Sequence, residues 1–570
     1  MPVLLGDTNT AVASNSKNVK EHWNNWPNEK GFDPKYEQLT PVELRVTGQI
    51  PAYAAGVLYR TGPGRSQLQT DHGNLFQLSH WFDGFTQTHR FQIIAPDDAE
   101  SPWVGTRVFY NSRFSSDQLM KNVQKAGTRD FSRSFGQKRD PCKALYSKAQ
   151  SEFVPSKGPS STNVGVTLSV NMPGLDFDDD DDGKLPDRWT GSNSIRNLYA
   201  KTDYNEFKQL DPETLEPIAQ ASQRNFHPEL AGPLVASHPR SDPVTGDVFN
   251  FNLEIGATST YRVFQVSAST GKTKILARFS AIPVYIHSLL LTEDFVILCL
   301  WNSHLDPLKV ADGVFKESIM PTDPSKPATW YVIDRKNDKG LIATYETPAF
   351  FCFHTINAWQ EPSKEDPSKI DIVADLVRTD SVAIIDLLGY EFIKSSLPKA
   401  KEYMANRGVD LNSTITRFHL PNIPQETTLE PKKASVEWSA CKEMAPELPT
   451  MNPSFGTRKH QYVYATASRG EATLTDGLMK LNCDTQDTQL WSRHAHTPGE
   501  PIFVADPNGT SEDDGVLLSV VLDGVQGTSY LLCLDARDMK ELGQAHVNGV
   551  VGFGFHGQHV PTTGLPTGDY

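Results

Sequence analysis

The stretch QLDPET, at Gln209–Thr214, carries the feature that decides the fold of this chain: a short apolar strand that ends in a tight turn. Close variants follow as QVSAST, VIDRKN, KLNCDT and CLDARD. The turn residues, each an Asp, Asn or Ser, are Asp211, Ser267, Asp334, Asn482 and Asp535. The sequence therefore contains a weak internal repeat of one strand and one turn.

The spacing of this repeat is typical of a β-propeller. Successive turns are 53–67 residues apart, and the one interval of 148 residues corresponds to two units. Such a period, filled with short strands, fits propeller blades with long loops. Apolar runs such as DVFNFNLEI, FVILCLW and GVLLSVVLD read as strands, and 39 Gly and 39 Pro residues limit long helices. With the room before the first turn included, we predict an all-β fold of about seven blades.

The composition is that of a globular protein that does not bind nucleic acid. Hydrophobic residues make up 38% of the 570, which is enough for a large core. A net charge of −15 argues against nucleic acid as a partner, because phosphate binding needs a basic surface. No apolar run approaches the roughly 18 residues of a membrane-spanning helix, and the six cysteines are scattered, as in a reducing compartment. We expect a cytoplasmic protein that is neither secreted nor inserted in a membrane.

Three segments of the chain differ in character. Residues 1–40 are polar, and we expect them to wrap around the body or trail from it. Residues 41–570 then form a single propeller domain. Within it, residues 113–157 carry ten Lys/Arg against four acids, interleaved with aromatic and aliphatic side chains. Two interpretations of this insertion are open: a solvated, mobile segment, or a cap whose basic and apolar side chains rest on a membrane surface.

Four histidines occupy nearly the same place in four of the repeat units. His287, His354 and His556 follow their turn residues by 20–21 positions, and His238 follows by 27. A lone histidine on an apolar strand is usually a hydrogen-bonded core residue. In a propeller, however, residues about twenty positions past the outer turn begin the innermost strand of the next blade. Equivalent positions then converge on the central axis, so we expect the four rings to meet.

Four converging imidazoles need a common partner, because burial otherwise leaves ring nitrogens unsatisfied. A metal ion satisfies all of them. Imidazole binds Fe(II), Zn(II), Cu(II) and Ni(II), so the ligand type leaves the metal open. The thiolates or close Cys/His spacing of structural zinc are absent from the sequence. Four neutral ligands around an octahedral ion leave two positions open, which suits the binding and activation of O₂.

Three acids stand where they could bind the outer nitrogens of such ligands. A ligating histidine usually donates its second N–H to a carboxylate or a carbonyl. Glu500 lies 18 residues after the turn residue Asn482, in the slot that the histidines occupy. Glu447 precedes a proline-rich turn, and Asp203 precedes the strand of the QLDPET turn. Taken singly, each acid is more typical of a surface or capping residue.

With these residues in view, the chain resembles the carotenoid cleavage oxygenases from about Thr47 to the C-terminus. The resemblance rests on a series of motifs in order: GVLYRTGPG, HWFDGFTQTHRF, STNVGV, ASHPRSDPVTGDVFNFN, YIHSLLLTEDFVIL, FFCFHTINAWQE, EPIFV and GFHG. It implies a seven-bladed β-propeller with a cap of loops and short helices over a central metal site. It also implies one Fe(II) ion per chain, held by His238, His287, His354 and His556.

The same resemblance implies roles for the acids and a reaction. Residues similar to Glu447 and Glu500 orient the third and fourth histidine ligands, and Asp203, with a shorter arm, takes the place of the remaining Glu. O₂ is the co-substrate, and oxidative cleavage of a conjugated C=C bond in an apolar tunnel gives two carbonyl products without an external reductant. Family members take substrate from membranes through apolar loops at the tunnel mouth, a use that the 113–157 insertion fits.

The stretch NLYAKTDYNEFKQLDPETLEP is most similar to fungal carotenoid-cleaving members, including those that cleave torulene and apocarotenoids. An apolar polyene is therefore the expected substrate. Cleavage of a resveratrol-type stilbenoid is the alternative: stilbene-cleaving relatives carry a Lys followed directly by Glu, whereas Lys201 is followed by Thr202 and Asp203. Two further alternatives are a metal-free propeller that serves as an interaction module and an isomerase on the same scaffold.

Overall fold

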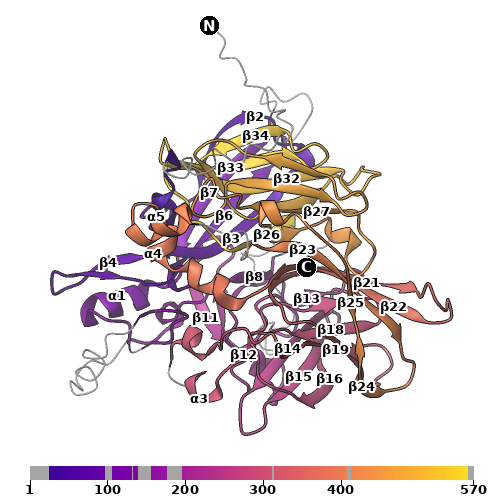
Figure 1. The fold of residues 1–570 in the computed structure, drawn as a ribbon. Coiled ribbons are helices and arrows are strands. Elements are labelled where there is room, and N and C mark those ends of the chain that lie inside the picture. The colour runs from indigo at the N-terminus through magenta and orange to yellow at the C-terminus, as the bar shows by residue number, and fades with distance from the viewer. Residues whose placement is uncertain are drawn as a thin grey trace.

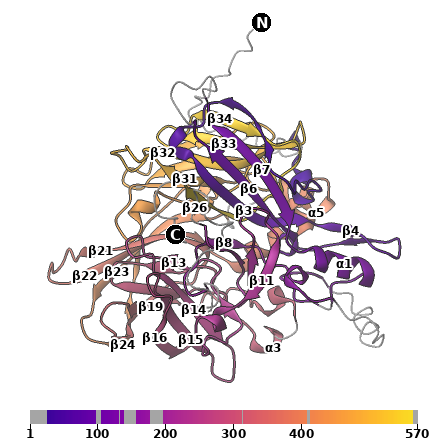
Figure 2. The same cartoon turned by 180° about the vertical axis from the view of Figure 1, so that it is seen from behind.

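The structure is a computed structural model that describes residues 25–96, 105–130, 132–138, 156–175, 195–310, 313–406 and 412–562. Seven sheets of four to six strands are arranged in a ring as the blades of a β-propeller (Figure 1 and Figure 2). We number these sheets blades 1–7 around the ring. The predicted all-β, seven-bladed fold is confirmed.

Blade 1 joins the two ends of the described chain. Its strands lie in the order β1-β7-β6-β3-β35, so that β35 from the C-terminal end pairs with β3 from the N-terminal end. This shared blade closes the ring. The strands of blade 1 are β1 (Val42–Glu43), β3 (Gly56–Arg65), β6 (Phe85–Ile94), β7 (Arg107–Phe114) and β35 (His556–Pro561).

Blades 2, 3 and 4 follow along the chain. Blade 2 consists of β8 (Thr167–Val170), β9 (Leu198–Lys201), β10 (Phe207–Leu210) and β11 (Pro217–Ala221). Blade 3 consists of β12 (Leu234–Val235), β13 (Arg240–Ser241), β14 (Val248–Glu254), β15 (Thr260–Val266) and β16 (Thr273–Ser280). Blade 4 consists of β17 (Leu290–Leu291), β18 (Phe295–Leu300), β19 (Ala328–Asp334), β20 (Leu341–Thr347) and β24 (Thr428–Lys433).

Blades 5, 6 and 7 complete the ring. Blade 5 consists of β21 (Phe351–Pro362), β22 (Ile370–Thr379), β23 (Thr414–Ile423) and β25 (Ser435–Ala440). Blade 6 consists of β26 (Glu447–Thr450), β27 (Tyr462–Ala467), β28 (Gly477–Asn482) and β29 (Thr488–Trp491). Blade 7 consists of β30 (His496–Pro498), β31 (Ile502–Ala505), β32 (Gly515–Asp523), β33 (Thr528–Asp535), β34 (Glu541–His546) and β2 (Arg45–Gly48).

The repeated turns found in the sequence end the third strand of five blades. Asp211 and Ser267 directly follow β10 and β15, and Asp334, Asn482 and Asp535 are the last residues of β19, β28 and β33. At Asp211, Oδ1 accepts hydrogen bonds from the backbone N–H groups two and three residues further on, at 3.0 and 2.9 Å. Each turn leads to the fourth strand of its blade, as predicted.

The long interval of the repeat has a structural explanation in blade 5. There the chain between the third and fourth strands, β23 and β25, forms β24, which leaves the blade and pairs in parallel with β20 of blade 4. A tight turn cannot be formed where the connecting chain adds a strand to a neighbour. The repeat is therefore present in this blade as strands but not as the turn motif.

Helices are short in the described part of the chain, and α1, α4 and α5 lie together on one side of the propeller, where they form a minor cap (Figure 1). The α-helices are α1 (Asp117–Ala126), α3 (Pro307–Val310), α4 (Tyr390–Ile393) and α5 (Pro398–Ala405). The 3₁₀-helices are η2 (Glu29–Phe32), η3 (Ala52–Ala54), η4 (Trp81–Asp83), η5 (Pro159–Ser161), η7 (Gln223–Asn225), η8 (Phe315–Ser318), η9 (Val382–Leu388), η11 (Lys442–Met444) and η12 (Pro453–Phe455). A separate hairpin pairs β4 (Gln67–Gln69) with β5 (Leu75–Gln77).

The described part of the 1–40 segment packs onto the propeller. Trp26 is 2% exposed and donates its indole N–H to Thr497 at 2.9 Å, and Phe32 is 1% exposed. Residues 25–40 therefore wrap around the body, one of the two expected arrangements. Residues 1–24 lie outside the described residues.

The described part of the 113–157 insertion also packs inward. Helix α1 buries Leu119, Met120 and Val123, which share a core cluster with Phe114. The remaining apolar residues of the insertion between 139 and 155, and residue 131, lie outside the described residues. Among the residues that the structure describes, no helix is long and apolar enough to cross a membrane.

Candidate metal centre

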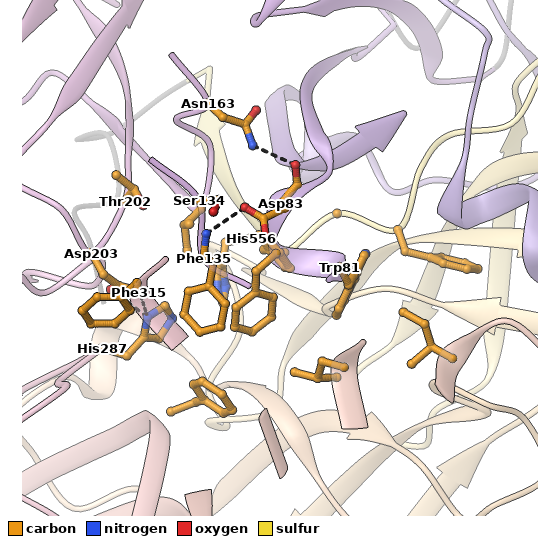
Figure 3. A pocket seen from close by; sticks show the side chains of 18 of the residues that line it. Trp81, Asp83, Ser134, Phe135, Asn163, Thr202, Asp203, His287, Phe315 and His556 are labelled. Atoms are coloured by element: carbon orange, nitrogen blue, oxygen red, sulfur yellow. Dashed lines mark hydrogen bonds and ion pairs between the residues drawn. The ribbon is translucent and has the colours of Figure 1, made fainter. Parts of the chain in front are cut away.

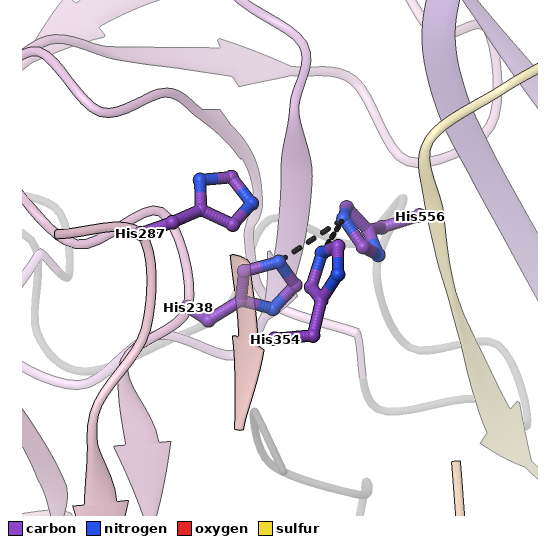
Figure 4. A group of neighbouring side chains, drawn as sticks. All are labelled: His238, His287, His354 and His556. Atoms are coloured by element: carbon purple, nitrogen blue, oxygen red, sulfur yellow. Dashed lines mark hydrogen bonds between the residues drawn. The ribbon is translucent and has the colours of Figure 1, made fainter. Parts of the chain in front are cut away.

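Four imidazole rings meet where the innermost strands of four blades come together. His238 comes from blade 3, His287 from blade 4, His354 from blade 5 and His556 from blade 1. One nitrogen of each ring lies within 4.8 Å of those of the other three, and the ring centroids are 4.2–6.2 Å apart (Figure 4). The structure thus brings together the four histidines that the repeat placed near the axis.

Each histidine stands at or near the start of an innermost strand. His238 lies two residues before β13, and His287 lies three residues before β17. His354 is the fourth residue of β21, and His556 is the first residue of β35. The pairing of β21 with β22 shifts register beside His354, so the strand is irregular there. The convergence of innermost strands brings together residues from opposite ends of the sequence.

Carboxylates hold the outer nitrogens of three rings. The Nδ1 contacts are Asp203 with His287 (2.8 Å), Glu447 with His354 (2.6 Å) and Glu500 with His556 (2.7 Å). In this pairing a carboxylate oxygen accepts the hydrogen bond from the ring N–H, so Nδ1 is the protonated nitrogen of each ring. Nε2 then presents its lone pair to the centre of the cluster, which is the tautomer that a metal ligand needs.

Asp203 occupies a different kind of position from the two glutamates. Glu447 is the first residue of innermost strand β26, and Glu500 lies two residues before β31, whereas Asp203 lies in the loop between β9 and β10. The Asp203 carboxylate also accepts hydrogen bonds from the Tyr285 hydroxyl at 2.9 Å and from the Ser237 backbone N–H at 3.2 Å. The shorter side chain reaches its imidazole directly and is held in place by these two donors.

Glu500 is the most enclosed of the three acids, with 9% of its side chain exposed. Its second oxygen accepts hydrogen bonds from Arg60 at 2.6 Å and from the Gly557 backbone N–H at 2.8 Å. Burial raises the pKa of Glu500 to about 7, and the charge of Arg60 acts against that rise. Arg60, in the GVLYRTGPG strand β3, had no role in the sequence-based prediction. The only sign of its importance in the sequence was the position of Arg60 within the GVLYRTGPG motif.

The donor set fits a divalent metal ion. The Nε2 atoms of His354 and His556 are 3.2 Å apart although each presents a lone pair. Burial, and then the neighbouring imidazoles, hold the pKa of His238 and of His556 well below the usual value, so these two rings are neutral. Facing lone pairs repel one another, and a cation between them is attracted to every ring. Neutral imidazoles in this arrangement suit Fe(II) and its neighbours among the transition metals.

A cavity of about 650 Å³ opens onto the cluster and is lined by His287, His354 and His556. Its walls are largely apolar. Six aromatic residues of the lining form a chain of ring contacts with centroids 4.8–5.9 Å apart: Trp81, Phe82, Phe135, Phe315, Phe353 and Phe555. Figure 3 shows Trp81, Phe135 and Phe315 at the cavity. A cavity of this size and lining takes a large apolar molecule.

The buried acid Asp83 holds one wall of this cavity in place. Its two carboxylate oxygens accept hydrogen bonds from the backbone N–H groups of Phe135 (2.8 Å) and Gly136 (2.7 Å). Arg129 pairs with the same carboxylate at 3.3 Å, and Asn163 donates to the Asp83 carbonyl at 3.2 Å (Figure 3). These contacts hold part of the 113–157 insertion in place, where it forms a wall of the cavity. The HWFDGF motif was noted in the sequence without a role for its Asp.

A second group of potential ligands was not anticipated from the sequence. Atoms of Asp375, His460 and Cys483 lie within 4.8 Å of one another, and all three residues are buried. Both oxygens of Asp375 accept hydrogen bonds from Arg417, at 2.9 and 2.8 Å. The guanidinium therefore already neutralises the carboxylate of this group. None of the three residues is among the described residues that line the cavity.

The fold and the site together define a class of protein: a seven-bladed β-propeller with four imidazoles at its centre, three of them held by carboxylates, beside an apolar cavity. The chain belongs to the family described as Retinal pigment epithelial membrane protein, which matches residues 31–561. This is the carotenoid oxygenase family that the motifs indicated, so the resemblance drawn from the sequence is confirmed.

Relatives match over nearly the whole chain. A protein named carotenoid dioxygenase from Neurospora crassa is 41% identical, over 95% of this chain and 92% of its own. A protein named torulene dioxygenase from Gibberella fujikuroi is 38% identical, over 96% of each chain. A solved mutant of Synechocystis apocarotenoid oxygenase, 20% identical, superposes with a TM-score of 0.68 over 95% of this chain and 99% of that one, which supports the fold. A further Synechocystis structure of this kind is described as cobalt-substituted.

Proposed function

We propose that this protein is a non-haem Fe(II) dioxygenase that cleaves a conjugated C=C bond of a carotenoid or apocarotenoid into two carbonyl products. The observation that carries the proposal is the placement of four converging imidazoles beside an apolar, aromatic-lined cavity. The relatives named carotenoid dioxygenase and torulene dioxygenase support the same substrate class. A torulene- or β-carotene-like polyene is the expected substrate.

The proposed ligands of the iron ion are His238, His287, His354 and His556. When bound, the ion supplies activation of O₂ for insertion into the double bond. Both oxygen atoms enter the two products, and the polyene supplies the electrons, so the reaction balances without an external reductant. The protein contributes position: Asp203, Glu447 and Glu500 keep the proton on Nδ1 of three rings and so fix ring orientation.

The cavity walls have the second task, which is to hold the polyene and exclude water. Phe82 packs against both Phe135 and Phe555, and these rings offer flat apolar surfaces. A rigid polyene held between such walls has one double bond next to the imidazole cluster, and proximity of this kind lowers the entropic part of the barrier. Exclusion of water also prevents competing reactions of activated oxygen.

Cleavage of a carotenoid is favoured over cleavage of a stilbenoid by the position of Lys201. A phenolic substrate needs a polar group that engages its hydroxyl. Lys201 is 1% exposed and is not among the described residues that line the cavity, whereas its neighbour Thr202 is. Asp203, the next acid along the chain, is engaged with His287. These placements leave the ammonium group away from the cavity and fit a hydrocarbon substrate.

Membrane contact through the 113–157 insertion is part of the proposal. Arg133 and Lys157 are exposed and belong to the cavity lining, which supports a substrate entrance on their side of the cavity. Basic side chains beside an apolar opening attract anionic lipid headgroups. Sedimentation with vesicles that contain phosphatidylserine, compared with neutral vesicles, tests this contact. The five described cysteines are free of disulfides, and we keep the cytoplasmic location as the expectation.

The Fe(II)-loaded protein is incubated with torulene, β-carotene, a β-apocarotenal and resveratrol under ¹⁸O₂. We expect loss of the visible polyene band and two aldehyde or ketone products, each with one ¹⁸O atom. Products from resveratrol alone would transfer the proposal to the stilbenoid alternative. A product of unchanged mass would show an isomerase, and a protein that binds neither metal nor substrate would show an interaction module.

A further inference from the structure

Three of the four histidines lie in or just before the innermost strands of three separate blades. β13, β17 and β21 belong to blades 3, 4 and 5, which pack on one another largely through side chains, with one isolated backbone bridge between His238 and Ser288. Side-chain packing alone tolerates small shifts between sheets, whereas metal–ligand distances must be right to within about 0.2 Å. A directional contact between the blades is therefore needed to set the spacing of the rings.

Arg240 makes such a contact across two neighbouring blades. It lies on β13 of blade 3, two residues after the histidine of that blade. Its Nε donates to the carbonyl of Leu289 at 2.9 Å, two residues after the histidine of blade 4. Its Nη2 donates to the carbonyl of Thr355 at 2.6 Å, the residue after the histidine of blade 5. One planar guanidinium thus holds the backbone beside three rings.

Thr355 and Ser288 complete this group. Thr355 Oγ1 accepts a hydrogen bond from Arg240 at 2.7 Å and donates one to the carbonyl of Leu289 at 2.8 Å. Ser288 Oγ donates to the carbonyl of Phe353 at 2.8 Å and accepts from the Thr355 backbone N–H at 3.0 Å. The backbone N–H of the blade 3 histidine donates to the carbonyl of the blade 4 histidine at 3.1 Å.

The group is buried, which makes its hydrogen bonds directional and costly to lose. Arg240 is 9% exposed, Thr355 is 6% exposed and Ser288 is fully buried. Guanidinium holds its N–H donors in a rigid fork, whereas the ammonium of lysine is a point charge on a flexible stem. Arginine is therefore the residue type that can fix two carbonyls at a set separation.

We propose that Arg240 is a positioning residue of the metal centre. By holding the backbone of Leu289 and Thr355, it sets the mutual distances of the rings of His238, His287 and His354. The inference rests on the proposed binding of a metal ion by these histidines. It assigns Arg240 no contact with the metal or the substrate.

Two matched variants test the proposal. Arg240→Lys keeps the positive charge and removes the fork. Arg417→Lys makes the same change at the buried ion pair with Asp375, away from the histidine cluster. Binding of Co²⁺ alone is measured by competition with a chelator, together with the visible spectrum of the bound ion and the midpoint of thermal unfolding.

We expect Arg240→Lys to weaken Co²⁺ affinity by about 10–100-fold, as for other residues that orient metal ligands. The visible bands of bound Co²⁺ should also change in position or intensity, because they report ligand geometry. Arg417→Lys should lower the unfolding midpoint and leave both Co²⁺ measurements as in the wild type. A purely structural role for Arg240 would lower the midpoint in the same way without changing the spectrum.

A second pair keeps the test decisive if Arg240→Lys does not fold. Thr355→Val removes the hydroxyl that Arg240 binds, and Thr355→Ser keeps it. We expect Thr355→Val to bind Co²⁺ more weakly and with an altered visible spectrum. Thr355→Ser should bind Co²⁺ with the affinity and spectrum of the wild type. Wild-type Co²⁺ binding in both Arg240→Lys and Thr355→Val, or an equal loss in Arg417→Lys, overturns the inference. Wild-type protein that binds Co²⁺ but cleaves no carotenoid overturns the proposed function and leaves this inference standing.

Discussion

Two groups of potential metal ligands are buried in this protein, and they differ in where their hydrogen bonds point. In the four-histidine cluster, carboxylates bind the outer nitrogens of three rings and leave the inner lone pairs facing one another beside a cavity. In the group of Asp375, His460 and Cys483, the guanidinium of Arg417 takes both oxygens of the acid. Burial, and then Asp375, raises the pKa of the Cys483 thiol, which therefore stays protonated.

The comparison teaches that closeness of ligating atoms does not by itself make a metal centre. Both groups have their candidate atoms within 4.8 Å of one another. They differ in whether lone pairs are left free and directed inward, and in whether a cation is already present. The following variants test this difference, from the largest expected effect on metal binding to the smallest.

Removal of one imidazole should have the largest effect. His354→Ala deletes a donor and leaves Glu447 without its partner at 2.6 Å. We expect loss of bound iron and of carotenoid cleavage, measured by metal analysis and by the polyene band. The matched change in the second group, His460→Ala, should retain the full metal content. Equal losses in the two variants would remove the distinction between the groups.

Replacement of an orienting carboxylate should have the next largest effect. Glu447→Gln keeps the size of the side chain and its acceptor oxygen but removes the charge that fixes the proton on His354 Nδ1. We expect metal affinity to fall by about 10–100-fold with the fold retained. Chelator competition measures the metal affinity, and circular dichroism shows whether the fold is retained. Unchanged affinity would show that the carboxylate does not control the ligand.

Removal of the Arg60 guanidinium, which pairs with Glu500, should reduce metal affinity less than Glu447→Gln does. It should clearly lower the free energy of unfolding. Arg60→Met leaves a buried carboxylate without its ion pair, and breaking such a pair costs about 3–5 kcal/mol of unfolding free energy. Metal affinity should fall less than in Glu447→Gln, because the Gly557 N–H still holds Glu500. Urea unfolding measures the free energy of unfolding, and metal titration measures the metal affinity. An affinity loss larger than that of Glu447→Gln would contradict this order.

The smallest effect on metal binding is expected in the second group. Cys483→Ser should keep the metal content of the wild type, because the thiol stays protonated and binds no ion. Burial of a hydroxyl in its place should lower the free energy of unfolding by about 1–3 kcal/mol. Metal analysis and urea unfolding are the measurements. A drop in bound metal would show that the group is a second metal site.

Much of the fold and of the central cluster could be read from the sequence because both follow from local patterns. The turn residues such as Asp211 act on backbone N–H groups two and three positions away, so their chemistry is visible in a short window. The four histidines were found because the start of each innermost strand lies at a nearly constant distance from the preceding turn. The blade 5 turn was missed because β24 pairs with another blade there.

Residues that act between blades were not predicted. Arg240, Arg60 and Asp83 each bind groups more than 40 residues away, so their partners are not visible in a short stretch of sequence. The direction of Lys201 was equally beyond the sequence. The direction of this side chain depends on which face of strand β9 lies toward the cavity, because successive side chains of a strand point to opposite faces.

The roles of the three acids came from the family resemblance, whereas the sequence by itself determined the repeat, the propeller and the four histidines that meet at its centre. These depend on turn chemistry and on strand periodicity, which are properties of neighbouring residues. The tertiary structure alone decided which nitrogens face inward, which group of buried ligands is already neutralised, and which guanidinium spaces the rings. Those features depend on contacts between blades, whose geometry is set by the packing of side chains that lie far apart along the chain.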